Sequence, residues 1–198
     1  MNQKKIWNNI AEEWHEFKTK PAENVIEFLK KQTGNVLDLG SGSGRHLIKI
    51  KKGKIYLVDF SEKMLKLAGK KADERNIKAE FIKADFTKLP FQNDFFDSAV
   101  FISSLHCIKG SKKREKAVEE LHRVLKSNAE VFVGVWNKNS KRFKNAQNEK
   151  YVKWRDKGER YYYLFEEDEI HKLFKKRGFK ITSTLSSELM INFIAEKT

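Results

Sequence analysis

Asn35-Val-Leu-Asp-Leu-Gly-Ser-Gly-Ser-Gly-Arg45 is the stretch that decides the fold. Val36, Leu37 and Leu39 form a short apolar run that stops at alternating glycines, which predicts a buried strand followed by a tight turn. Glycine lets a backbone turn sharply and approach a ligand closely, because it carries no Cβ. We expect a helix over 43–51 to follow the turn, with its free N–H groups aimed at that ligand.

The spacing inside this turn separates it from other glycine turns. A dinucleotide-binding turn would have G-x-G-x-x-G and a P-loop would have Gly-Lys-Ser/Thr, and the sequence has neither. Asp38 stands two residues before the first glycine, where a carboxylate would repel phosphates but suit a cofactor with an ammonium group. The pattern D-x-G-x-G-x-G resembles motif I of the class I S-adenosylmethionine (SAM) methyltransferases. The alternative is an ordinary strand–turn–helix without a cofactor.

Two further acidic residues follow expected strands. Asp59 ends the strand 54–59, where a carboxylate can accept both ribose hydroxyls; helix capping is the alternative, but Ser61 already suits that role. Asp85 follows the strand 78–83, where the family uses an acid to accept from the adenine amino group; a turn-forming Asp is the alternative. The resemblance thus implies a cofactor site made of Asp38, Gly40, Ser41, Gly42, Asp59, Phe60, Met64, Asp85, Phe86 and Ser103.

Alternating strands and helices predict a doubly wound α/β sheet in one domain, 1–198. By resemblance this is the Rossmann-like class I methyltransferase fold: seven mostly parallel strands in the order 3-2-1-4-5-7-6, with helices on both faces. The apolar runs 179–185 and 189–195 form the closing hairpin, whose last strand is antiparallel. The sequence predicts an amphipathic helix over 2–18 before the first strand. The resemblance implies that it is a helical lid, with Trp7 or Trp14 lining the site; the alternative is a helix that only packs on the domain.

The positive charge of the chain is concentrated in one segment. The sequence holds 41 Lys and Arg against 27 Asp and Glu, a net charge of +14, and the basic insertion 138–160 carries +6 of it. Phe143, Tyr151 and Trp154 lie between these bases. Such a mixture suits stacking on, and phosphate contacts with, an unpaired nucleic-acid loop. The alternatives are a mobile, solvated insertion and a Lys-rich surface with no partner.

Composition also excludes several classes of protein. Cys107 is the single cysteine, so we expect no disulfide framework and no metal site built on cysteines. No apolar run reaches membrane-spanning length and the N-terminal residues lack a signal-peptide pattern. We therefore expect a cytoplasmic protein with no membrane contact.

Finer motifs extend the resemblance over nearly the whole chain. Trp7-x-x-Ile10-Ala11, Ser104-Leu-His106, Arg160-Tyr-Tyr-x-x-Phe165 and a distal Asn192-Phe occur in order. Together they resemble the tRNA wobble-uridine carboxymethyl methyltransferases of eukaryotes and archaea. Departures are Tyr163 and Cys107 where that family has histidines, Lys18 where it has arginine, and Ser127-Asn128-Ala129 in place of a Pro-Gly-Gly turn.

That resemblance implies methylation of the carboxylate of 5-carboxymethyluridine in a tRNA anticodon loop, and a small zinc-binding activator protein that pairs with an edge of the sheet. A carboxylate is already ionised near pH 7, so no catalytic base is assigned. The residues expected to position the substrate are Lys18, His106, Arg160, Tyr161, Tyr162 and Asn192. The alternative is a small-molecule O- or N-methyltransferase of the quinone-precursor or lipid-amine type. A non-enzymatic scaffold would be expected to have lost the cofactor acids, which are all present.

Overall fold

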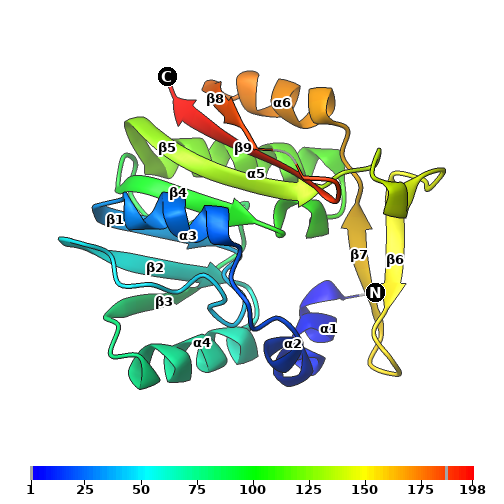
Figure 1. Cartoon of the computed structure of the whole chain (residues 1–198), viewed down its shortest axis with the longest axis horizontal. Helices are drawn as coiled ribbons and strands as arrows, with labels where there is room; N and C mark the ends of the chain where they lie inside the picture. Colours follow the sequence, from blue (N-terminus) through cyan, green and yellow to red (C-terminus); the bar gives the residue numbers. More distant parts are fainter. Residues whose placement is uncertain (1, 186) are drawn as a thin grey trace.

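A seven-stranded sheet forms the centre of the computed structural model, which describes residues 2–185 and 187–198 (Figure 1). The strand order is β3-β2-β1-β4-β5-β9-β8, and β9 pairs antiparallel with both of its neighbours while the other pairs are parallel. This confirms the predicted order, with β8 and β9 as the closing hairpin. The strands are β1 (Gly34–Leu39), β2 (Gly53–Asp59), β3 (Ala79–Lys83), β4 (Phe96–Ile102), β5 (Leu125–Trp136), β8 (Phe179–Thr184) and β9 (Met190–Lys197).

Helices cover both faces of the sheet, as predicted, because alternate strand residues point to opposite sides. Val36 packs in one core, with α3 (Glu23–Lys30) and α4 (Glu62–Glu74). Leu37 packs in the other, with α5 (Ser111–Val124) and α6 (Glu167–Lys175). Figure 1 shows α3 in front of the sheet and α5 behind it.

The helix expected over 43–51 is wrong. Residues 42–46 form turns and 47–50 have no regular structure. Gly44 has a φ of +71°, outside the right-handed helical region, and the amide of Leu47 bonds to the Gly44 carbonyl in a single short turn. Leu47 and Ile50 are buried, so their side chains enter the core from irregular backbone. The ligand-facing helix N-terminus therefore does not exist here.

The N-terminal helices and the basic insertion are joined to each other. The helix expected over 2–18 is two helices, α1 (Gln3–Asn9) and α2 (Ala11–Phe17), and the insertion forms a short 3₁₀ helix, η2 (Lys141–Phe143), and a hairpin of β6 (Glu149–Lys153) with β7 (Glu159–Tyr163). Glu13 accepts a 2.6 Å hydrogen bond from Trp154 and forms salt bridges with Arg155 and Lys157. Figure 1 shows these elements beside the carboxyl ends of the central strands.

Candidate active site

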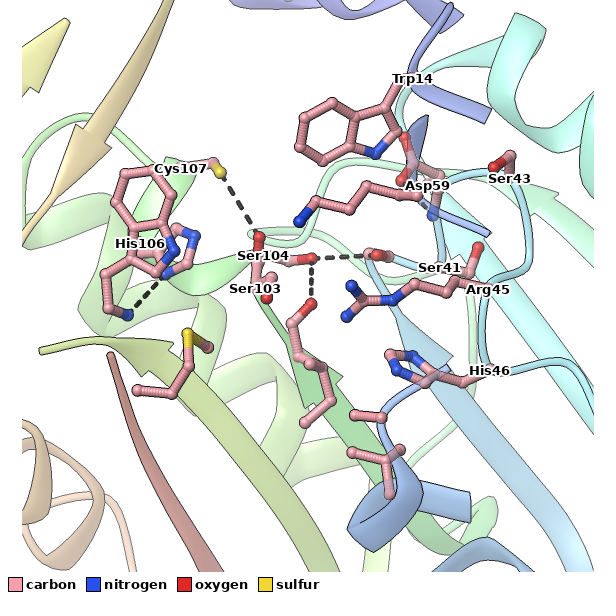
Figure 2. A pocket seen from close by; sticks show the side chains of 18 of the residues that line it. Trp14, Ser41, Ser43, Arg45, His46, Asp59, Ser103, Ser104, His106 and Cys107 are labelled. Atoms are coloured by element: carbon pink, nitrogen blue, oxygen red, sulfur yellow. Dashed lines mark hydrogen bonds between the residues drawn. The ribbon is translucent and has the colours of Figure 1, made fainter. Parts of the chain in front are cut away.

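A cavity of about 450 Å³ opens at the carboxyl ends of β1, β2 and β4 (Figure 2). Trp7 and Trp14 of the N-terminal helices cover part of it. The predicted site residues that line it are Lys18, Gly40, Ser41, Gly42, Asp59, Phe60, Met64, Phe86, Ser103, His106, Tyr162 and Asn192. Four other predicted residues do not form its wall: Asp38, Asp85, Arg160 and Tyr161.

Two buried carboxylates lie at the ends of β1 and β2, and Asp59 lines the cavity there. Asp59 accepts hydrogen bonds from the amides of Gly42, at 3.0 Å, and Ser61, at 2.8 Å. Burial raises the pKa of Asp59 to about 6, although these amides oppose the shift. Asp38 is 2% exposed, and burial raises its pKa to about 7 against the attraction of Arg45. One of its oxygens, Oδ2, has no hydrogen-bond partner among the described residues, so it can accept from a cationic ligand.

Aromatic and small residues continue the wall beside these acids. The rings of Phe60 and Phe86 lie 6.2 Å apart, and Met64 lines the cavity with them. Gly40 has a φ of +77°, and a Cβ there would collide with the Ser104 side chain. The Ser41 hydroxyl is buried without a described partner. This donor set fits SAM: apolar faces for adenine, a carboxylate for the ribose, and unpartnered polar atoms for the amino-acid end.

Local geometry explains why two predicted residues lie outside the wall. The Asp85 carboxylate accepts from both the amide and the hydroxyl of Thr87, at 2.8 and 2.7 Å, which is turn geometry; its contact with adenine stays a prediction. Tyr161 and Tyr162 are neighbours on β7, so they point to opposite faces. Tyr162 faces the cavity, whereas the Tyr161 ring packs 5.5 Å from Tyr151.

His106 is held in one tautomer. It lies on η1 (Leu105–Cys107), and its Nδ1 accepts a 3.0 Å hydrogen bond from the Trp136 amide. That acceptor role requires the proton to be on Nε2. Burial lowers the pKa of His106 to about 3, so the ring is neutral. His106 therefore presents a hydrogen-bond donor rather than a proton acceptor.

A cation cluster, which we define as Lys18, Arg45, Arg142 and Arg160, lies in and beside the cavity, and of the four only Lys18 and Arg45 line it. Burial and the positive charge of the three arginines lower the pKa of Lys18. None of the four forms a salt bridge with a residue in 2–185 or 187–198. Figure 2 shows the Arg45 side chain pointing from the glycine turn toward the middle of the cavity.

Arg160 does not reach the wall because aromatic rings enclose it. Its guanidinium carbon lies 4.8 to 5.9 Å from the ring centroids of Trp7, Trp14, Trp154 and Tyr162. Its Nη1 donates a 2.7 Å hydrogen bond to the Tyr162 hydroxyl. Sequence reasoning missed the cavity residues Arg45, His46 and Trp136. The available signal was a cation directly after the third glycine and an aromatic residue at a strand end.

Comparisons with known proteins agree with this geometry. Residues 36–128 match a protein family described as a methyltransferase domain. The chain is 30% identical over 134 residues to the tRNA (carboxymethyluridine(34)-5-O)-methyltransferase of Arabidopsis thaliana, covering 67% of this chain and 32% of that protein. It is also 30% identical over 109 residues to the demethylmenaquinone methyltransferase of Thermus thermophilus, covering 53% of this chain and 48% of that protein. The chain thus spans about a third of the length of the first relative and about half of the length of the second.

Solved structures share the fold. A SAM-dependent methyltransferase from Methanosarcina mazei superposes with a TM-score of 0.74 at 21% identity, covering 89% of this chain and 98% of that one. A methyltransferase from Haloferax volcanii, solved with the Trm112 methyltransferase activator, superposes with a TM-score of 0.73 at 16% identity, covering 95% and 93%. The architecture is therefore the class I methyltransferase fold. Residues 36–128, which include the glycine turn and both buried acids, match the methyltransferase domain, and S-adenosylmethionine is the cofactor that this fold and cavity fit.

The described residues also bear on metals and membranes. No three His, Cys, Asp or Glu side chains in this part of the chain are grouped closely enough to hold a metal ion. None of its helices has the length and apolar character needed to cross a bilayer.

Cofactor affinity should rise with pH through the range 5.5 to 7.5. Asp38 and Asp59 have raised pKa values, so they are largely protonated at the lower limit and accept poorly from ammonium and hydroxyl groups. Each carboxylate contributes up to about tenfold per pH unit. Calorimetric titration of the protein with SAM across this range measures the effect.

The same two carboxylates should make the folding stability fall with pH, whereas they make the cofactor affinity rise. Because their pKa values are raised on folding, the protein without cofactor loses stability as pH rises through this window. Asp38→Asn should flatten both profiles. An affinity for SAM that does not change between pH 5.5 and 7.5 would contradict the roles given to these residues.

Proposed function

We propose that this methyltransferase acts on the carboxylate of 5-carboxymethyluridine at the wobble position of tRNA and produces the methyl ester. The cation cluster carries the proposal. Four positive side chains without salt-bridge partners gather in and beside the cavity, and for the buried Arg160 and the half-buried Lys18 and Arg45 this is costly unless anions are near. Asp38 attracts Arg45, and the cofactor's own carboxylate can neutralise only one further charge. An anionic acceptor accounts for the rest better than a neutral one does.

Aromatic residues at the acceptor end suit a nucleobase. The rings of Trp136 and Tyr162 stack at 4.1 Å and 25°, and both line the cavity. Bound SAM supplies an activated methyl group on a sulfonium. The chain's own residues then align the acceptor: Lys18 attracts its carboxylate, the His106 Nε2–H donates to an oxygen, and Asn192 offers an amide to the uracil edge. Holding two reacting groups in line is the main catalytic contribution that this arrangement can make.

The β6–β7 hairpin supports the choice of an RNA substrate. Lys150 is paired with Tyr162 across the hairpin, so both lie on the face that looks toward the cavity. Lys153 is paired with Glu159 and lies on the opposite face. A tRNA whose anticodon loop reached the cavity would contact the Lys150 face. A small quinone precursor, the competing substrate class, would contact neither lysine.

An activator subunit is part of the proposal. The Haloferax volcanii neighbour was solved with a methyltransferase activator, and β3 of the present chain is an edge strand that pairs only with β2. Phe81 on this strand is 37% exposed. An exposed apolar side chain on an unpaired strand edge is a ready site for a partner strand.

Methyl transfer from labelled SAM to tRNA lacking the final methyl group of the wobble modification tests the function. The reaction is run with and without a zinc-binding activator of this type, and nucleosides are analysed by mass spectrometry. We expect a methyl ester on carboxymethyluridine. SAM binding without label in tRNA, with the activator present, would leave the fold and cofactor standing and reject this substrate.

Lys18→Met should lower kcat/KM for tRNA roughly 10- to 100-fold, which is the range for losing one charged hydrogen bond. The substitution keeps most of the apolar stem that lies near Trp14. Lys20→Met, two residues along and exposed, is the matched control and should retain wild-type activity. Calorimetry with SAM separates loss of the acceptor from loss of the cofactor. Equal activity of the two variants would remove Lys18 from the acceptor site.

Lys150→Glu should weaken tRNA binding several-fold more than Lys153→Glu, although both change the charge of an exposed strand residue by the same amount. In Lys150→Glu, the loss of one phosphate contact should also reduce the slope of log affinity against log salt by about 1. Binding of labelled tRNA at several salt concentrations measures both quantities. Identical losses in the two variants would mean that the hairpin acts by net charge alone.

A further inference from the structure

Phe17 is the most exposed large apolar side chain in the described residues, at 62%. It ends α2, next to Lys18, and Lys18 and Trp14 both line the cavity. An apolar ring at the rim of a site, surrounded by positive charge, has no role in the core. The ring is therefore available to a partner outside the folded chain.

Aromatic contacts hold the Phe17 ring in place. Its centroid lies 5.4 Å from that of Trp154, at an interplanar angle of 72°, and 6.1 Å from that of Trp14. Trp154 is fixed in turn by its hydrogen bond to Glu13. Neither tryptophan stacks flat on Phe17, which agrees with the large exposure of the ring. Phe17 is thus supported from beside and left open to solvent.

The charges around Phe17 indicate the chemistry of the partner. The Lys18 ammonium lies 5.0 Å from the Phe17 ring centroid, and the Arg160 guanidinium lies 4.8 Å from the centroid of the adjoining Trp154. Proteins hold unpaired nucleotides with open aromatic faces that stack on the bases and with nearby positive charge that attracts the backbone. Arg160 is enclosed by rings, so its charge acts here only at a distance. An apolar protein partner would instead be expected to avoid such charge.

We infer that Phe17 is a stacking platform for the base next to the target uridine, so that the single-stranded RNA is held at two successive nucleotides. The inference rests on the proposed tRNA substrate and adds a specific contact to it. With the target base at the Trp136–Tyr162 wall, the strand leaves the cavity past Lys18. The first unpaired base outside then meets the open face of Phe17. Such a contact favours an unpaired loop over a free nucleoside.

Phe17→Ala should weaken binding of an anticodon stem-loop RNA about tenfold, within the range measured for losing one base–aromatic stack. Phe17→Trp should retain binding within about twofold, since it keeps an aromatic face. Fluorescence anisotropy at several salt concentrations is the measurement. Because stacking involves no phosphate, the salt slope of Phe17→Ala should equal that of the wild type, unlike that of Lys150→Glu. SAM affinity should not change in either Phe17 variant.

An abasic nucleotide on either side of the target uridine identifies the stacked base. For one of the two abasic RNAs, the wild-type protein should lose about as much affinity as the Phe17→Ala variant loses for intact RNA. The Phe17→Ala variant should then bind that abasic RNA with no further loss. Full additivity for both abasic RNAs would overturn the inference. Leu185→Ala is the matched control, because it removes another exposed apolar side chain and should leave RNA binding unchanged.

The possible failures are distinguishable. Wild-type protein with activator that binds no stem-loop RNA would overturn both the tRNA proposal and the stacking contact. Wild-type binding with an unaffected Phe17→Ala variant would overturn the stacking contact alone. Loss of activator binding, rather than RNA binding, in Phe17→Ala would assign this ring to a protein interface and also reject the inference.

Discussion

The left-handed turn at Gly40, Gly42 and Gly44 is the constraint on which the rest of the site depends. It brings the amide of Gly42 to the Asp59 carboxylate and so ties the end of β1 to the end of β2. Asp38, two residues before the turn, is buried with one oxygen unpartnered among the described residues. Because no helix follows the turn, Arg45 and His46 reach the cavity from irregular backbone. The φ angles of this turn thereby help to position both the Asp59 carboxylate and the Arg45 cation in the cavity.

The cover of the cavity depends on a second interaction, the burial of Arg160 among aromatic rings. The rings come from two segments far apart in sequence: Trp7 and Trp14 from the N-terminal helices, and Trp154 and Tyr162 from the β6–β7 hairpin. Cation–π contacts are worth more when the cation is desolvated, and Arg160 is only 5% exposed. Glu13 reinforces the same joint from outside. The N-terminal helices and the basic insertion therefore cover the cavity together, and a disturbance of one is expected to reach the other.

Much of the fold was predictable because strand and helix periodicity is local. The apolar run Val36, Leu37 and Leu39 predicted the first strand. The strand order cannot be predicted from periodicity, and it came from the resemblance to class I methyltransferases. The prediction of a helix over 43–51 was wrong. Leu47 and Ile50 are apolar and three residues apart, as in a helix, but the positive φ of Gly44 appears only in the folded turn. Alternation along β7 should have separated Tyr161 from Tyr162, but a strand was not expected there. The cation cluster was not predictable, since Lys18, Arg45, Arg142 and Arg160 meet only through tertiary packing.

Division of charge within the cavity constrains the chemistry of the acceptor. The proposed reaction cancels one positive and one negative charge, so a site of low polarity favours it once both groups are bound. Tight bidentate pairing of the acceptor carboxylate would work against this, because it would stabilise the anion in the ground state. A lysine at position 18 supplies a point charge, whereas arginine would supply a planar fork that grips both carboxylate oxygens. The rings around Arg160 likewise keep its N–H donors away from the substrate, so that its charge attracts the substrate only at a distance. The cations can therefore attract the substrate with no more than a single contact from Lys18 to its carboxylate, and the neutral His106 donor can orient that carboxylate at a smaller cost in nucleophilicity.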